Sequence, residues 1–401
     1  MNKYKLSDET KTTPEGVILH RVVATKTFTL ANGDTINAGD LGGWIEKESN
    51  LSDNAWVSDD AQVSGNAKVS DDALVSGKAQ VYGNAKVYGN ARVYGKAKIS
   101  GNTLVCGNAR VYGDAQVDGN AVVSGNAKVS DNAQVYGKAL VYDKAQVYGN
   151  ARVYGKAKVY NNAKVYGYAL VYDKAKVYGK AKVSDKAQVN SNAQVCGKTR
   201  VYEYALVCGN ALVYDDAQVY GNATVYGNAW VYDDAQVYGN AKVSGDAMVS
   251  DNAQVYGDAE VYDNAEVYGN AQVYENAQVY GNAWISGDAR VSGNAQVYGD
   301  AKVYDDALVS GHALVYGNAK VSDNAQVYGN AKVYGHAWVY GYAKVCDDAK
   351  ICDNAQVSDE AKVSGNAWVS GNAKVYWEAM VSGNAHVYGN AQVFEWFTGL
   401  W

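Results

Sequence analysis

The stretch QVYGKALVYDKAQVYGNARVYGKAKVYNNA, residues 134–163, contains one six-residue pattern five times. Each hexad reads Val, Tyr, a Gly, Asp or Asn, a Lys or Asn, Ala, and one variable residue. Outside this stretch, Val or a close relative recurs every six residues from Leu51 to Val393 without an insertion, which makes 58 hexads. Only Thr103 and Thr199 replace the Ala. Self-similarity at a fixed period indicates a repeat architecture more strongly than any local propensity does.

One hexad predicts a short strand followed by a corner. In Ala-x-Val, the Ala and the Val point to one face of a strand and the middle residue points to the other. The Gly-Asn or Asp-Asn pair tolerates a left-handed backbone and turns the chain. Gly and Asn every six residues, together with β-branched Val, exclude a helix. We therefore expect an all-β fold in which three edges close a triangular coil of 18 residues around Val and Ala.

This pattern resembles the hexapeptide repeat of left-handed parallel β-helix proteins over about 343 of the 401 residues. Three segments, Lys3-Tyr4-Lys5-Leu6-Ser7, Leu41-Gly42-Gly43-Trp44-Ile45 and Leu51-Ser52, are similar to the opening of an uncharacterised bacterial hexapeptide-repeat family described as acetyltransferases. The resemblance implies a left-handed triangular β-solenoid of about 19 coils. At ~4.8 Å per stacked strand, we expect a rod about 90 Å long.

Composition and charge limit the class of protein. The chain has 35 Tyr against 3 Phe, and its 19% charged residues with a net charge of −6 exclude a disordered polyelectrolyte. No run of about 18 apolar residues predicts a membrane span, and MNKYKLSDET lacks the apolar centre of a secretory signal. The odd number of cysteines and their spacing argue against disulfides and favour a reducing compartment. We expect a cytoplasmic protein.

The chain divides into three predicted regions. Residues 1–50 are expected to form a small N-terminal β cap, with a strand pair around Gly16–Leu30 and a turn at Asn32-Gly33-Asp34. Residues 51–393 form the solenoid. The aromatic residues within 394–401 predict a C-terminal cap, with an apolar docking tail as the alternative. Caps are expected because open strand edges pair with other chains.

The residue before each Val is expected to point outward, and sorting these residues by a period of 18 separates three faces. The first face carries an apolar stripe, which consists of Leu104, Val122, Leu140, Leu212, Trp230, Met248, Trp284 and Trp338. A contiguous exposed apolar stripe usually marks an interface. We therefore expect a protein partner or parallel self-association; the alternative is neutral drift within a duplicated repeat.

The second face carries a basic ladder, which consists of Arg92, Arg110, Lys128, Lys164, Lys182 and Arg200. A neutral run of Gln218, Gln236, Gln254 and Gln272 follows it. Stacked like charges ~5 Å apart repel each other, so this ladder suggests a polyanion such as a nucleic acid or a polysaccharide. The alternative is a solvated surface. The third face, which includes Gln62, Gln80 and Lys98, predicts plain solvent-facing surface.

The residue after Val is expected to form the outer covering of the coils. It is Tyr in 31 of the 58 hexads, Ser in 19 and Cys in 5. Stacked tyrosines can shield the strands while their hydroxyls stay in water. A flat aromatic surface can also bind sugars or unstacked bases, and both interpretations stay open. The cysteines, which we interpret as substitutes for Ser, are Cys106, Cys196, Cys208, Cys346 and Cys352.

Residues suited to catalysis or metal binding are sparse. His312 and His336 replace Asn at different predicted corners, so they cannot share a ligand. They are the candidates for a general base if the chain transfers acyl groups, although no inserted loop suggests a pocket for a pantetheine arm. One corner stacks Asp215, Asp233 and Asp251, which could hold a cation such as Ca²⁺ or be solvated turn residues. We expect no cofactor.

These observations predict a non-enzymatic, rod-like scaffold or binding protein that acts through flat solenoid faces, of a kind that suits phages and mobile elements. Two alternatives stay open. One is an acyltransferase of the hexapeptide type. The other is a protein that binds a polyanion, a nucleic acid or a carbohydrate along the basic and tyrosine-rich face.

Overall fold

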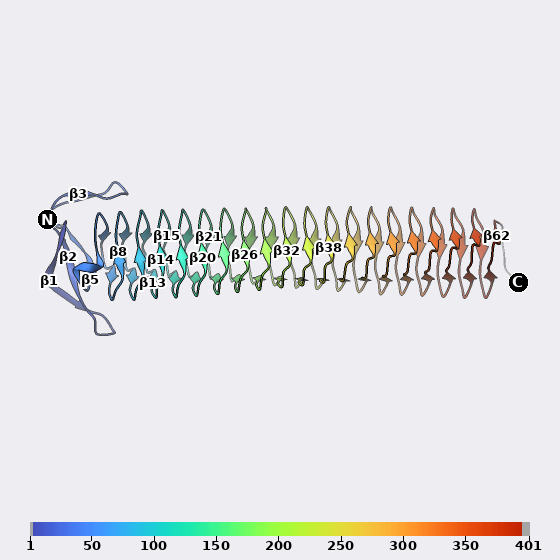
Figure 1. Cartoon of the computed structure of the whole chain (residues 1–401), viewed down its shortest axis with the longest axis horizontal. Helices are drawn as coiled ribbons and strands as arrows, with labels where there is room; N and C mark the ends of the chain where they lie inside the picture. The colour runs from blue at the N-terminus through green and yellow to red at the C-terminus, as the bar shows by residue number, and fades with distance from the viewer. Residues whose placement is uncertain (1–2, 395–401) are drawn as a thin grey trace. The chain divides into compact units, whose positions relative to one another are not determined.

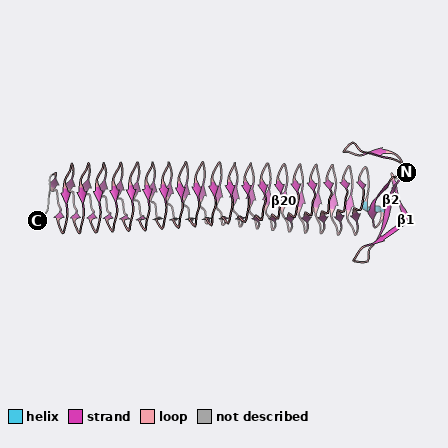
Figure 2. Ribbon diagram, turned by 180° about the vertical axis from the view of Figure 1, so that it is seen from behind, coloured by secondary structure: helices cyan, strands magenta, loops and turns pink. Residues whose placement is uncertain are grey.

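The computed structural model describes residues 3–394 and divides the chain into two compact units, Met1–Tyr202 (unit 1) and Glu203–Trp401 (unit 2). Within each unit, short parallel strands follow one another along stacked coils (Figures 1 and 2). The helix content of the described residues is a single turn, η1 (Glu48–Asn50). None of them lies in a helix long and apolar enough to cross a membrane. The predicted all-β class is confirmed.

The solenoid part of unit 1 runs from β6 (Trp56–Val57) to β30 (Arg200–Val201). Each strand has two residues, a variable one and the core Val or Ile, and begins six residues after the previous strand. Within the unit, strands one coil apart pair in parallel, as β12 (Arg92–Val93) does with β15 (Arg110–Val111). The N–H of Arg92 donates to the carbonyl of Ala109 at 2.9 Å. Three such strands therefore make one coil of 18 residues.

Unit 2 repeats this arrangement from β31 (Leu206–Val207) to β62 (Gln392–Val393). A representative pair is β35 (Trp230–Val231) and β38 (Met248–Val249), which are parallel and in register. The described part of the two units holds 57 two-residue strands, β6 to β62, and three of them make a coil. The prediction of about 19 coils is confirmed.

An antiparallel cap precedes the first coils of unit 1. β1 (Tyr4–Thr12) pairs antiparallel with β2 (Ile18–Ala24), and β2 pairs antiparallel with β5 (Leu41–Ile45). β5 also pairs in parallel with β7 (Gln62–Val63), so the cap continues directly into one sheet of the solenoid. Nearby, the buried side chain of Asn50 donates to the carbonyl of Ala67 at 2.8 Å. The predicted N-terminal β cap is confirmed.

The pairing predicted inside the cap is partly wrong. The strand pair expected around residues 16–30 does not form, because a turn at Gly16, whose φ is +82°, instead joins β2 to β1. The turn predicted at residues 32–34 does form, with Gly33 at a φ of +92°, and joins the hairpin strands β3 (Phe28–Thr29) and β4 (Thr35–Ile36). Of the predicted C-terminal cap, residues 395–401 lie outside the described residues.

The repeated Ala and Val fill the inside of the coils. Ala157 and Val159, like most of their counterparts, have no exposed surface. The two exceptions to the Ala rule, Thr103 and Thr199, are equally buried. The Thr103 hydroxyl donates to the carbonyl of Ser100, and Thr199 donates to that of Cys196. Thr is accommodated because a carbonyl three residues earlier accepts the hydrogen bond of its buried hydroxyl.

The corners need a left-handed residue, and Asp supplies it where Gly is absent. Among the described non-glycine residues, 21 have positive φ, and 16 of these are Asp. Asp71 has a φ of 56°, and its carboxylate accepts a hydrogen bond from the N–H of Gly89 on the next coil at 2.9 Å. Asp251 and Gly269 repeat this contact at 2.9 Å. The bond to the next coil offsets the steric strain that a left-handed backbone imposes on a residue with a Cβ.

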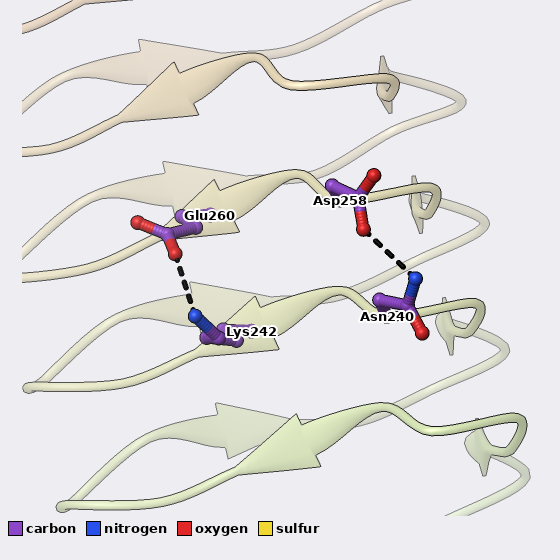
Figure 3. A network of polar contacts seen from close by, with 4 residues as sticks. All are labelled: Asn240, Lys242, Asp258 and Glu260. Atoms are coloured by element: carbon purple, nitrogen blue, oxygen red, sulfur yellow. Dashed lines mark hydrogen bonds and ion pairs between the residues drawn. The ribbon is translucent and has the colours of Figure 1, made fainter.

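Amide side chains at the following corner position form ladders along the coils. In unit 1 each side-chain amide donates to the next at 3.0–3.2 Å through Asn66, Asn84, Asn102 and Asn120. In unit 2 Asn240 donates to Asp258 at 2.8 Å (Figure 3). Amides can stack in this way because each one is both a donor and an acceptor.

Tyrosine rings stack along the outside of the coils. One such run in unit 2 has ring centroids 4.8–5.0 Å apart and planes within 3° of each other, through Tyr262, Tyr280, Tyr298, Tyr316 and Tyr334. The Tyr280 hydroxyl donates to Gln296 at 3.4 Å. Burial raises the pKa of both Tyr238 and Tyr280 to about 12. The predicted shielding role of tyrosine is consistent with this packing.

The corner geometry yields a first prediction, tested at Asp71. Asp71→Asn keeps a side-chain acceptor, so we expect it to change local stability little, whereas Asp71→Gly keeps the left-handed backbone but loses the acceptor and should have an intermediate effect. Asp71→Ala loses the acceptor and leaves a Cβ at positive φ, which costs about 1–2 kcal/mol. Native-state hydrogen exchange at the Gly89 amide measures the difference. If Asp71→Ala protects this amide as well as Asp71→Asn does, the proposed role of Asp at the corners is wrong.

A second prediction concerns alkaline pH. The pKa of Tyr238 and Tyr280 in the folded chain, about 12, lies above the value of about 10 for an unfolded tyrosine. Folding therefore favours the neutral phenol, and this stabilisation is full below pH ~10 and is lost as the pH rises through about 12. Phenolate absorbance should titrate at higher pH in the native protein than in urea. Tyr238→Phe plus Tyr280→Phe should reduce the late-titrating absorbance; coincident native and unfolded titration curves would contradict the prediction.

Candidate functional site

The outward residue of each two-residue strand forms the candidate binding surfaces. In Lys158–Val159, for example, Val159 is fully buried while Lys158 is partly exposed. Parallel pairing places such outward residues one above another on consecutive coils, so each face is a set of side-chain ladders. The residues predicted for each face can therefore be located by strand register.

On the first face of unit 1, the structure brings together three residues of the predicted stripe. Leu104 pairs with Val122, and Val122 pairs with Leu140, and all three are partly exposed. Lys86 precedes this triplet and Lys158 follows it. The apolar patch in unit 1 therefore spans three coils and is bordered by charge at both ends.

On the first face of unit 2, a second triplet is followed by single tryptophans. Leu212, Trp230 and Met248 pair in sequence on three consecutive coils, and Trp230 is 44% exposed. Glu266 then separates Met248 from Trp284, which is 38% exposed. The stripe is therefore contiguous within the triplet and interrupted beyond it.

Lysines partly cover the two later tryptophans of the stripe. Lys302 Nζ lies 4.0 Å from the ring centroid of Trp284, a cation–π contact. Lys320 Nζ lies 5.8 Å from the ring of Trp338, and the Trp338 indole N–H donates to Ser322 at 3.1 Å. Trp338 is accordingly less exposed than Trp230. Trp230 is therefore the most accessible aromatic residue of the stripe.

On the second face, the predicted basic ladder lies entirely in unit 1. Its residues lie on consecutive coils, with one neutral residue, Gln146, between Lys128 and Lys164. The pairing order is Arg92, Arg110, Lys128, Gln146, Lys164, Lys182 and Arg200. Within residues 3–394, Arg92, Arg110 and Lys128 form no ion pair. The structure thus brings three uncompensated cations together on adjacent coils.

The third face carries an aromatic site that the sequence analysis missed. Trp368 is 39% exposed, lies 5.4 Å from the ring of His386, and donates its indole N–H to Cys352 at 3.1 Å. Elsewhere on this face, Lys242 forms an ion pair with Glu260 at 2.9 Å (Figure 3). Sorting outward residues by the 18-residue period could have revealed Trp368, because it occupies the same position in its hexad as Trp230.

The position after Val is less outward than predicted. Cys346 and Cys352 are only 3% and 2% exposed, and Ser322 is 1% exposed. A larger side chain 16 residues further along the chain, on the next coil, can cover such a residue. Trp338 covers Ser322 in this way. A small residue at this position is therefore buried by its neighbours, which the hexad pattern alone does not reveal.

The carboxylates of the predicted cation site contact the backbone of the next coil. Asp233 accepts a hydrogen bond from the N–H of Asp251 at 3.5 Å, and Asp251 accepts one from Gly269 at 2.9 Å. Asp215 occupies the same left-handed corner position. Within residues 3–394, no group of three or more His, Cys, Asp or Glu side chains could hold a metal ion.

The two candidate histidines lie apart. The backbone N–H of His312 donates to Gly329, and that of His336 donates to Asp353, each at 2.7 Å. Since 24 residues separate them, one coil and one further edge, they occupy different corners of unit 2. The two histidines therefore cannot act together as a pair in acid–base chemistry.

Comparison with known proteins supports the repeat architecture. A family model described as the YdcK beta solenoid repeat matches the chain in several segments, which are residues 61–77, 79–95, 85–101, 105–119, 145–161, 217–233, 235–251, 241–257, 277–293, 283–299 and 325–341. No curated protein matches the chain. The left-handed winding, the resemblance to acetyltransferases and the phage or mobile-element origin stay predictions. The repeat matches and the coiled parallel strands together establish that the chain is a β-solenoid repeat protein.

Proposed function

We propose that the chain is a non-enzymatic scaffold that associates with a second copy of itself through the first face. The observation that carries this proposal is the triplet Leu212, Trp230 and Met248, which presents large apolar side chains on three consecutive coils of unit 2. Contiguous exposed apolar residues on a soluble protein usually mark an interaction surface.

A second copy is the occupant that best fits this surface. Each outward ladder repeats at the spacing of the coils, 5.0 Å between the stacked rings of Tyr214 and Tyr232 in this part of unit 2. A second copy in parallel orientation repeats at the same spacing, so each apolar side chain can meet a counterpart on every coil. A partner with another periodicity would lose this match within a few coils.

The charges around the triplet favour a defined alignment. Glu266 follows Met248 on the next coil, and Lys302 follows Trp284. In a parallel pair shifted along the coils, lysines of one copy can approach the glutamate of the other. Interfacial charges of this kind contribute more to alignment than to affinity. The apolar residues would then supply most of the binding free energy.

The proposal predicts an oligomer that depends on Trp230 and Trp284. We expect wild-type protein to associate with rising concentration in sedimentation velocity, and Trp230→Glu plus Trp284→Glu to be monomeric, because a carboxylate cannot be buried unpaired in an apolar interface. Trp368→Glu is the matched control, since Trp368 is similarly exposed but lies on the third face.

Two results would overturn self-association through the first face. One is wild-type protein that stays monomeric at every concentration tested. The other is equal dissociation by the first-face pair and by Trp368→Glu, which would indicate a general effect of added charge. Circular dichroism of each variant shows whether the β-structure is retained.

A further inference from the structure

A groove of about 480 Å³ lies in unit 1 between the second face and the hairpin of the cap. On one side is Ala31, in the turn between β3 and β4. The other lining residues come from three consecutive coils and are Asn90, Arg92, Asn108, Arg110, Asn126 and Lys128. Figure 1 shows the β3 hairpin alongside the first coils of this unit. The volume is typical of sites that bind small molecules or short polymer segments.

The polar side chains that line this groove form no hydrogen bond or ion pair within the described part of the chain. Arg92, Arg110 and Lys128 form no ion pair there. Among residues 3–394, the side-chain amides of the three asparagines form no hydrogen bond, whereas Asn66, Asn84 and Asn102 at another corner bond to one another. The residues that precede the groove asparagines are Gly89, Gly107 and Gly125, so these three corner positions carry no carboxylate; the Asp71 carboxylate of the preceding coil accepts a hydrogen bond from the Gly89 N–H at 2.9 Å. The groove therefore combines three positive charges with three available amides.

These groups are arranged as two parallel rows with one member of each row per coil. The coil spacing beside them is 4.9 Å, measured between the stacked rings of Tyr94 and Tyr112, which follow the Arg92 and Arg110 strands. A ligand that binds both the row of cations and the row of amides is linear, lies along the stack of coils, and carries an anionic group at regular intervals. Between the anions it needs groups that both donate and accept hydrogen bonds, as amides do.

We propose that this groove binds an anionic polysaccharide, with its carboxylates or sulfates on the cations and its hydroxyls on the asparagine amides. Guanidinium groups form paired, charge-assisted hydrogen bonds with planar carboxylates. Sugar hydroxyls are both donors and acceptors, which matches the amide row. The proposal concerns the second face of unit 1 and is independent of self-association through the first face.

A single-stranded nucleic acid fits the groove less well. Proteins that bind single strands without sequence preference stack the bases on aromatic side chains. The lining holds three asparagines, three cations and Ala31, and no aromatic ring. The cations alone would attract phosphates, but the amide row and the absence of a stacking surface in the lining favour sugars.

The test measures equilibrium binding of the full chain to polygalacturonate, heparin, neutral dextran and poly(dT) at several salt concentrations. We expect polygalacturonate or heparin to bind, and the tighter of the two identifies carboxylate or sulfate as the preferred anion. Dextran should not bind, and poly(dT) should bind more weakly than the preferred glycan. Arg92→Gln, Arg110→Gln and Lys128→Gln together should weaken glycan binding about tenfold or more, because they remove charge-assisted hydrogen bonds.

A matched triple variant separates the groove from general electrostatics. Lys86→Gln, Lys158→Gln and Lys176→Gln remove the same charge from the first face of unit 1. We expect them to leave glycan affinity within about twofold of wild type, because distant surface charges are screened by salt. Asn90→Ala, Asn108→Ala and Asn126→Ala should weaken binding severalfold without changing its salt dependence. Ala31→Trp should block the groove and weaken binding while all cations remain.

Three outcomes would overturn the proposal. The first is that neither glycan binds even at low salt. The second is that both charge-removing triples weaken binding equally, which would show a diffuse electrostatic effect. The third is that poly(dT) binds more tightly than either glycan, which would indicate a nucleic-acid surface instead. Thermal melting followed by circular dichroism shows whether each variant is folded, so loss of binding through unfolding is recognised directly.

Discussion

Backbone hydrogen bonds between coils impose the constraint on which the rest of this structure depends. A strand of two residues forms few hydrogen bonds with the next coil. One of them is the bond from the Arg92 N–H to the Ala109 carbonyl, at 2.9 Å. Stability must therefore come from many such contacts between neighbouring coils, as in other repeat proteins. An inserted residue that did not bulge out at a corner would move every later side chain off its ladder. The uninterrupted period of six residues from Leu51 to Val393 meets this requirement.

The same register makes every residue the neighbour of its counterpart one coil away, which favours some residue types and penalises others. Asparagines stack well because an amide both donates and accepts, as Asn66 and Asn84 do. Aspartates stack because each carboxylate accepts a backbone N–H of the next coil, as Asp71 does. Arginine and lysine side chains only donate, and on the second face of unit 1 Arg92, Arg110 and Lys128 form no ion pair with any residue that the structure describes. The anionic ligand that we propose for the groove would offset the repulsion between these stacked cations.

The 18-residue period of the sequence correctly predicts which residues share a face, but it predicts their exposure to solvent less well. The 18-residue period correctly places Leu212, Trp230 and Met248 side by side. It does not reveal that Lys302 lies over Trp284, because that contact depends on the direction of a long side chain. It also assigns Cys352 to an outward position, although the indole of Trp368 covers the sulfur. Spacing along the chain determines which residues are neighbours, whereas side-chain packing determines which of them meet solvent.

The sequence by itself determined the all-β class, the coil of three strands, the Val and Ala core, and the membership of each face. These follow from a strict period, because parallel pairing converts sequence spacing into spatial neighbourhood. Only the tertiary structure decided the pairing of β1 with β2 and the position of the hairpin turn at Ala31 beside Arg92 and Arg110. The cap has no repeat, so its placement depends on packing between residues far apart in the chain. For that reason the ladders could be predicted residue by residue, while the groove could not.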